Sequence, residues 1–470
     1  MAHPYLALRP TRNGWVSHYA VAGSKNPLPL GMGSVKNGLF ADDFRQIFLS
    51  GGIIMLAEYY AGNRARLYSR LQTGELLAIF SGEDTWKTGD EPYAFFADRN
   101  FVYLTGLKNS RSAILLAAKD ADGSVQERLY LLPPDAYAER WTGARVKPQE
   151  AEQIGGIHDV RFLASFERDF KALATSGNYQ KLYLDLYRFT PESPDRPAHR
   201  LLQRVQRDFA YLQIGNADDL LSELRLIKQP CEIEALRKAE EITKAGILAM
   251  MRNSHPGKYE YQYKADFDYA LGQFSPDGPG FPSIISAGKN NFCIHYYSYT
   301  GQAQDGDMIL NDVGAQYDCM ITDVSRGWPC NGCFSERQRI LYECVLATSD
   351  YMFSIIRPGM PMEAVDATIR KYNAERLVEA GVLKSVDEIG TYMWHGGAHH
   401  IGYDVHDRVK RPEIIAPGMV FCVDIGVYHE EWGIGFRLED NCLVTENGCE
   451  NLSAGIPRTI ADIEAVMRGE

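Results

Sequence analysis

The amino-acid sequence predicts a smaller α/β domain followed by a larger α+β domain that holds the functional residues. Chain length is the first reason, because 470 residues exceed one ordinary domain, and ~150 residues per domain implies two or three. Strand-like and helix-like runs also alternate in the first half, as in α/β domains. A long helical pattern at residues 218–252 then opens a second group of strands and helices. We therefore predict domains at residues 61–217 and 218–470.

The first 60 residues precede both predicted domains. They are rich in Gly, Pro and Asn, so we expect an extension with little regular structure. Their sequence indicates no role. The N-terminus lacks the basic start and apolar core of a secretory signal, and we therefore expect a cytoplasmic protein.

The elements of the two domains follow from periodicity. In the first domain, residues 76–80 and 112–118 are strand-like and residues 165–176 are helix-like. The helical pattern that opens the second domain is interrupted at Pro230, because proline lacks the amide proton that a helix interior needs. Beyond it we predict four strands and two helices, at residues 309–313, 319–324, 419–427 and 435–444 and at residues 336–355 and 362–380.

Composition excludes several functional classes. With 45% hydrophobic and 23% charged residues, the chain is close to the average soluble globular protein. It contains no apolar run of the ~20 residues that a membrane span needs, so we expect no membrane partner. The net charge of −12, without clusters of Lys and Arg, argues against nucleic acid. Nine cysteines, an odd number, do not indicate a disulfide framework.

Two aspartates in a predicted hairpin indicate a cation. If the turn between the strands is centred between Gln316 and Tyr317, Asp312 lies opposite Ile321, and Asp323 is its diagonal neighbour on the same face. Two unpaired carboxylates on one face would repel each other. A divalent metal between them would remove that repulsion.

The second predicted strand pair repeats this pattern. Asp424 interrupts an apolar run, and Arg437 and Glu439 share one face by two-residue periodicity. Between the carboxylate blocks lies a segment rich in histidine, with His395, His399, His400 and His406. Four carboxylates and one neutral imidazole carry a charge of about −4, which two divalent ions would cancel, and oxygen-rich ligand sets favour Mn²⁺ over Zn²⁺.

These blocks resemble aminopeptidase P and prolidase, in the family of pita-bread metallopeptidases that also includes methionine aminopeptidase. The resemblance covers about residues 71–453 and also rests on residues 224–237, 293–296, 328–334 and 417–420. It implies a pita-bread catalytic domain preceded by a creatinase-type N-terminal domain. It also implies a homodimer or homotetramer in which the first domain helps to wall the active site.

The resemblance also implies the roles of individual residues. Asp312 would bind one metal, Asp323 and Glu439 would bridge two metals, and His399 and Asp424 would complete the second site. The expected reaction is hydrolysis of an N-terminal Xaa-Pro bond by a hydroxide that bridges two divalent ions, Mn²⁺ first and Co, Fe or Zn as alternatives. Catalytic roles fall to His295, His406, Asp424 and Arg437, and substrate binding to His295, His395, His406 and Tyr428.

One departure from the family leaves other functions open. The family has Glu-Pro-Gly where this chain has Asp424, Ile425 and Gly426, and one fewer methylene withdraws the carboxylate by ~1.5 Å. A non-peptidase enzyme that uses the same metals, such as a lyase or a small-amide hydrolase, is therefore an alternative. A binding module descended from the fold ranks last, because all five ligand positions hold residues able to coordinate a metal.

Overall fold

The computed structural model describes residues 55–275, 277–410 and 412–470. The expectation for residues 1–54 of the predicted extension therefore lies outside the described residues. The last residues of that extension are helical, because helix α2 (Ala57–Arg70) already begins at Ala57. No helix of the described part is long and apolar enough to cross a membrane.

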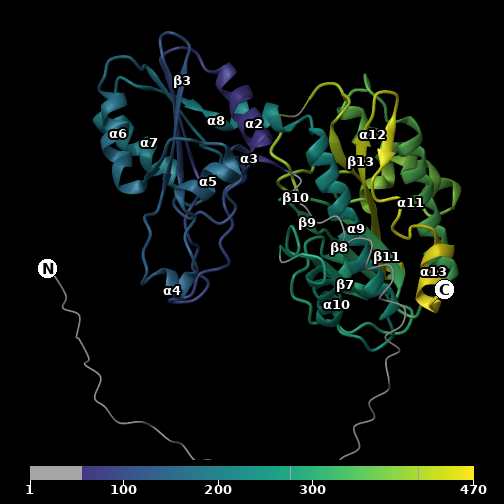
Figure 1. Cartoon of the computed structure of the whole chain (residues 1–470). Coiled ribbons are helices and arrows are strands. Elements are labelled where there is room, and N and C mark those ends of the chain that lie inside the picture. The colour runs from purple at the N-terminus through teal and green to yellow at the C-terminus, as the bar shows by residue number, and fades with distance from the viewer. Residues whose placement is uncertain (1–54, 276, 411) are drawn as a thin grey trace, which may run out of the picture. The chain divides into compact units, whose positions relative to one another are not determined.

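The first domain is a six-stranded sheet with helices on both faces, as predicted for an α/β domain (Figure 1). The strand order is β4-β3-β2-β1-β5-β6. The strands are β1 (Glu75–Phe80), β2 (Ile114–Lys119), β3 (Val125–Leu131), β4 (Val160–Phe162), β5 (Lys181–Leu184) and β6 (Gln213–Asn216). The helices after α2 are α3 (Arg99–Thr105), α4 (Glu139–Thr142), α5 (Pro148–Gly155), α6 (Phe166–Ala174) and α7 (Pro197–Asp208).

Alternation along β1 determines which helices cover which face. Leu77 and Ile79 are buried with residues of α2, α3 and α5. Leu76 and Ala78 are buried on the other face with residues of α6 and α7. Successive strand side chains point to opposite faces, so a strand that is buried on both faces reads as a continuous apolar run.

The second domain contains the sheet that positions the functional residues. Its main strand order is β12-β13-β11-β8-β7, and β14 pairs with β13. The strands are β7 (Ile284–Ala287), β8 (Met308–Val313), β11 (Val324–Pro329), β12 (Val420–His429), β13 (Ile434–Val444) and β14 (Cys449–Asn451), with β9 (Gln316–Tyr317) and β10 (Met320–Ile321) as a separate short pair.

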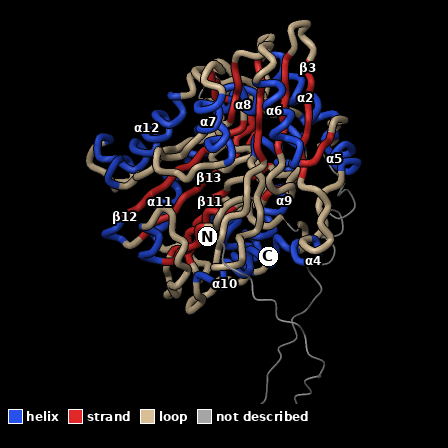
Figure 2. Tube along the Cα trace, turned by 90° about the vertical axis from the view of Figure 1, so that its left-hand side faces the viewer, coloured by secondary structure: helices blue, strands red, loops and turns tan. Residues whose placement is uncertain are grey.

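Helices cover this second sheet and confirm the predicted α+β arrangement. They are α9 (Pro230–Arg252), α10 (Glu260–Gly272), α11 (Glu336–Ile355), α12 (Glu363–Glu379) and α13 (Ile460–Arg468), whereas α8 (Ala217–Arg225) packs against α2 and β5 of the first domain. The predicted interruption at Pro230 is confirmed, because α9 begins at that residue, where a missing amide proton is tolerated. Helix α11 lies beside β12 and β13 (Figure 2), and buried side chains of all three elements belong to one core cluster.

The predicted register of the β8–β11 hairpin is wrong. Asp312 pairs with Ser325 and not with Ile321, because the turn is formed by Asp318 and Cys319, two residues later than expected. Both turn residues have positive φ, 48° and 67°, as in the turns that match the twist of a hairpin. Moving a turn by two residues shifts the pairing by four. Because four is even, Asp312 and Asp323 still share a face.

Candidate metal centre

Four carboxylates lie on one face of the second sheet. Asp424 of β12 is directly opposite Glu439 of β13. Glu439 is opposite Ser325 of β11, and Ser325 is opposite Asp312 of β8. Opposite residues in antiparallel strands share a face, as do residues two apart along one strand, which adds Asp323 to the group. The folded chain therefore brings together all four carboxylates that were predicted as metal ligands.

His399 joins this group from the loop beside β12. Its Nε2 atom lies 3.5 Å from Oδ2 of Asp323 and 3.4 Å from Oε1 of Glu439. The loop is held by backbone hydrogen bonds, from the Cys422 amide to the His399 carbonyl (2.8 Å) and from the Asp424 amide to the Gly397 carbonyl (3.0 Å). All five predicted ligands are thus in one cluster.

The cluster has free donor atoms. Each of its four carboxylates has one buried oxygen without a hydrogen-bond partner among the described residues, namely Oδ1 of Asp312, Asp323 and Asp424 and Oε1 of Glu439. Buried polar atoms in proteins nearly always have a partner, so unpaired ones need an explanation. Oxygen donors with one imidazole are a ligand set that suits divalent ions. The residues present therefore fit divalent metal ions, as the sequence led us to expect.

Electrostatics supports the same conclusion. Burial, with the charges of Glu439 and Asp312, raises the pKa of Asp323 well above its usual range. Burial and the charge of Asp424 raise the pKa of Glu439 to about 6. Without a cation these carboxylates repel each other, whereas bound divalent ions would favour their ionised forms.

Two basic side chains balance the outer part of the cluster. Arg437 donates to Oδ2 of Asp312 over 2.8 Å and to the hydroxyl of Tyr428 over 2.9 Å. Nδ1 of His395 lies 3.0 Å from Oδ2 of Asp424. Burial alone favours the neutral acid of Asp424, but His395 and Arg437 hold its pKa below the usual value. A side chain at Gly426 would displace the His395 ring, because its Cβ would lie 2.3 Å from Nε2 of His395.

The remaining predicted residues lie at the edge of the cluster. The ring of His406 meets that of His399 edge-on, with the centroids 4.5 Å apart, and His406 lines a pocket of about 570 Å³. The exposed ring of His295 stacks against the ring of Tyr297, with the two ring centroids 6.4 Å apart. The carbonyl of Ile294, next to His295, accepts hydrogen bonds from Arg437 at 3.3 Å.

The loop that carries His406 has a buried anchor. Asp407 accepts hydrogen bonds from Arg225 and, over 2.8 Å, from Lys228. All three side chains are 1% exposed. Breaking such a pair would leave an uncompensated buried charge, so the ion pairs hold the backbone beside His406 in one position.

Three functional candidates were missed by sequence reasoning. Ser325 donates to Oε2 of Glu439 over 2.8 Å, and Asn441 hydrogen-bonds both the amide and the carbonyl of Asp323. Cys422 offers a sulfur that lies within 4.8 Å of ligand atoms of Asp323, His399 and Glu439. Each missed residue is two positions from a predicted ligand along the chain. Strict two-residue periodicity would have found all three.

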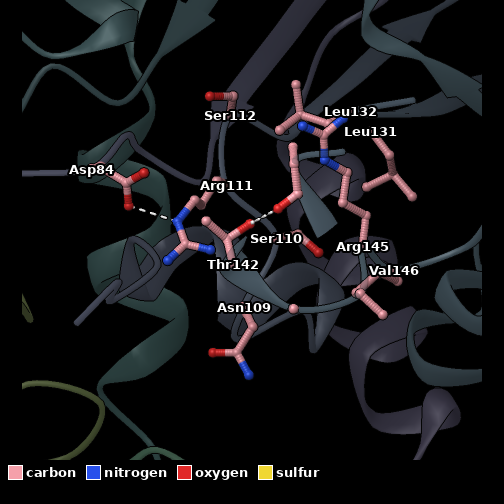
Figure 3. A pocket seen from close by; sticks show the side chains of 13 residues that line it. Asp84, Asn109, Ser110, Arg111, Ser112, Leu131, Leu132, Thr142, Arg145 and Val146 are labelled. Atoms are coloured by element: carbon pink, nitrogen blue, oxygen red, sulfur yellow. Dashed lines mark hydrogen bonds and ion pairs between the residues drawn. The ribbon is translucent and has the colours of Figure 1, made fainter. Parts of the chain in front are cut away.

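A separate pocket of about 250 Å³ lies in the first domain (Figure 3). Its lining includes Ser110, Arg111 and Arg145, and Arg111 is paired with Asp84 at 2.6 Å. None of the predicted site residues lines this pocket. The predicted chemistry therefore belongs to the second domain.

Comparison with known proteins agrees with this geometry. Residues 234–446 match the model of metallopeptidase family M24, and residues 60–183 match the aminopeptidase P N-terminal domain. The chain is 30% identical over 432 residues to the Xaa-Pro aminopeptidase of Haemophilus influenzae, covering 87% of this chain and 97% of that protein.

Solved structures give the same result. A Bacillus anthracis protein assigned as an aminopeptidase P has a TM-score of 0.86 and 34% identity, covering 88% of this chain and 99% of that one. Aminopeptidase P from E. coli with the inhibitor Pro-Leu has a TM-score of 0.81 and 27% identity, again covering 88% and 99%. The predicted family and fold class are thus confirmed. The chain belongs to metallopeptidase family M24, with an aminopeptidase P N-terminal domain ahead of its pita-bread catalytic domain.

Proposed function

We propose that this metallopeptidase hydrolyses the N-terminal Xaa-Pro bond of peptides at a centre of two divalent metal ions. The observation that carries the proposal is the cluster of four carboxylates beside His399, each of which has one buried oxygen without a hydrogen-bond partner among the described residues. The relatives support the substrate class, because the similar proteins from Haemophilus influenzae and E. coli are Xaa-Pro aminopeptidases.

The ligands proposed for the two ions are Asp312, Asp323, His399, Asp424 and Glu439. In the assignment taken from the family, Asp323 and Glu439 would bridge the ions. That assignment is consistent with His399, whose Nε2 is 3.5 Å from Asp323 and 3.4 Å from Glu439. We propose Mn²⁺ as the metal because most donors are carboxylate oxygens, with Co, Fe or Zn as alternatives. Two bound ions would supply an activated water and polarise the scissile carbonyl.

The surrounding side chains have positioning and binding roles in this proposal. Arg437 holds Asp312 and Tyr428 in fixed orientations through the bonds described above. His395 orients Asp424, which needs such support because its carboxylate has a shorter reach than the glutamate of relatives. His406 and His295 at the edge would hydrogen-bond the substrate and stabilise the oxyanion that develops during hydrolysis. Tyr428 and His395 would border the bound peptide.

The non-peptidase alternative keeps one observation in its favour. Oδ2 of Asp424 is engaged with His395, so only Oδ1 of this carboxylate is free for a metal or a water. A changed geometry at this point is compatible with a different substrate. We also propose, from the family, a homodimer or homotetramer in the cytoplasm, which size-exclusion chromatography with light scattering and cell fractionation would test.

The decisive experiment is an assay of the full-length protein after removal of metal and restoration of Mn²⁺. Release of the N-terminal residue is measured from a tripeptide with proline at the second position and from the same peptide with alanine there. We expect cleavage of the proline peptide, little cleavage of the alanine peptide and loss of activity with a chelator. A protein that holds two metal ions but leaves Xaa-Pro dipeptides and tripeptides intact would favour the non-peptidase alternative, which a screen of small amides would then examine.

A further inference from the structure

We propose that Cys422 is a selective metal ligand, whose thiol coordinates soft or borderline ions such as Cd²⁺ and Co²⁺ at the metal centre and leaves Mn²⁺ to the oxygen ligands. The inference rests on the proposed metal centre and concerns which ions that centre prefers. The oxygen-rich ligand set read from the sequence favours Mn²⁺, and a sulfur donor beside it changes that preference.

The strand β12 directs Cys422 toward the cluster. Cys422 precedes Asp424 by two residues, so both side chains lie on the same face of the strand. Its partner across the hairpin is Asn441, which holds the backbone of Asp323. Nδ2 of Asn441 lies 3.7 Å from Sγ, in a weak hydrogen bond to the sulfur.

Distances place the sulfur close to coordination range. The ligand atoms of Asp323, His399, Cys422 and Glu439 all lie within 4.8 Å of one another. Bonds of about 2.3 Å to sulfur and about 2.1 Å to oxygen or nitrogen place two ligands of one ion at most about 4.4 Å apart. A change of a few tenths of an ångström in side-chain position would therefore bring the sulfur into the coordination sphere.

Independent evidence for a ligand at this point comes from the carboxylates. Asp323 is 4% exposed and Glu439 is 2% exposed, and each has one oxygen without a hydrogen-bond partner among the described residues. Cys422 itself is fully buried. Sulfur, imidazole and carboxylate donors thus come together at one buried point.

Donor chemistry then separates the metals. Thiolate is a soft ligand that suits Zn²⁺ and similar ions, whereas Mn²⁺ prefers carboxylate and water. As the bond from sulfur to metal forms, the thiol proton leaves to the solvent, so no oxidant or reductant is needed. With Mn²⁺ we expect no bond between the metal and the sulfur.

The test compares the full-length wild type with Cys422→Ser and with Cys442→Ser as a matched control. Cys442 is also fully buried, but it lies on the adjacent strand opposite Phe421, on the other face of the sheet. Each protein is freed of metal and loaded with Co²⁺, Cd²⁺ or Mn²⁺. Near-ultraviolet absorption detects thiolate-to-metal charge transfer, elemental analysis counts the ions, and competition with a chelator gives the affinity.

We expect a charge-transfer band with Co²⁺ and Cd²⁺ in the wild type and in Cys442→Ser, and its loss in Cys422→Ser. Cd²⁺ affinity should fall at least about tenfold in Cys422→Ser, since even residues around a ligand often contribute that much. Mn²⁺ affinity should be unchanged.

Wild type that binds two Co²⁺ ions without a charge-transfer band overturns the role of Cys422 and leaves the metal centre intact. A band that persists in Cys422→Ser overturns it as well. Failure of the wild type to bind any divalent ion overturns both proposals. Because the wild-type spectrum alone can reject the inference, the test does not depend on the folding of the variant, and Cys422→Ala provides a second substitution.

Discussion

Oδ2 of Asp424 lies 3.0 Å from Nδ1 of His395, while Oδ1 of the same carboxylate has no partner among the described residues. One oxygen is therefore held by the protein and the other is free for a metal or a water. Because the family has glutamate here, this pair marks the point where the centre of this chain differs from its relatives. Displacements of ~1 Å at a reacting centre can change rates ~100-fold.

Asp424→Glu tests whether this difference alters the reaction. We expect the variant to keep or raise Xaa-Pro cleavage, because it restores the reach of the family side chain while Asp323, Glu439 and His399 remain in place. Measurement of kcat/KM on one Xaa-Pro tripeptide, for wild type and variant with equal metal content, decides the question.

The opposite result would have a clear meaning. If Asp424→Glu lowers the activity of a wild type that does cleave the peptide, the longer side chain crowds the centre, and the strand has adapted to aspartate. Absence of cleavage by both proteins with two metals bound would remove the peptidase proposal.

Asp323→Ala should reduce the metal content of the purified protein below two ions per chain. In the proposed centre Asp323 is a bridging ligand, so its loss should affect both ions. Elemental analysis measures the ratio, with Asp122→Ala in an exposed turn of the first domain as the control. Full metal occupancy in Asp323→Ala would contradict the central assignment.

His406→Ala should lower turnover far more than it lowers metal content. The centroid of the His406 ring lies 4.5 Å from that of the His399 ring. His406 is nevertheless at the edge of the cluster, where we place the substrate. Loss of a group that stabilises the oxyanion can reduce kcat by about 10²–10³-fold. Kinetics and metal analysis on the same sample measure both effects, and His158→Ala at an exposed position serves as the control. Parallel loss of metal and activity would mean that His406 supports the ligands.

Glu240→Gln should stabilise the fold above about pH 5, and by more as pH rises to about 8. Burial of the Glu240 side chain within α9 raises its pKa to about 8, and one carboxyl oxygen accepts a hydrogen bond from Ser453 at 2.9 Å. Between the unfolded pKa of about 4.3 and the folded one, the unfolded chain has lost the proton while the folded chain keeps it. The free energy of unfolding of the wild type therefore falls with rising pH in that window, by ~3 kcal/mol at neutral pH.

Urea denaturation at pH 4, 6 and 8 measures this effect, because glutamine cannot ionise and removes the pH-dependent loss. The exposed neighbour Glu241 is the matched control, and Glu241→Gln should show no such trend. An equal difference between wild type and Glu240→Gln at all three pH values would show that Glu240 is ionised in the folded protein.

The site could be predicted from the sequence where local geometry decides it. The faces of β12 and β13 follow from two-residue alternation, so Asp424, Arg437 and Glu439 could be assigned to one side of the sheet. Interactions between distant residues had no such local signal. The contact from Arg437 to Asp312 spans 125 residues, and the contact from Ser325 to Glu439 spans 114 residues.

The sequence by itself determined the family, the long helices α9, α11 and α12, the strands β1, β2, β8, β12 and β13, and the choice of the five proposed ligands, because these depend on residue type and on the periodicity of single segments. Only the tertiary structure decided that Asp312 pairs with Ser325, that His395 engages Asp424, and that Cys422 faces the carboxylates. The physical reason is that register and side-chain partners depend on the turn geometry and on contacts between strands that are far apart in the chain.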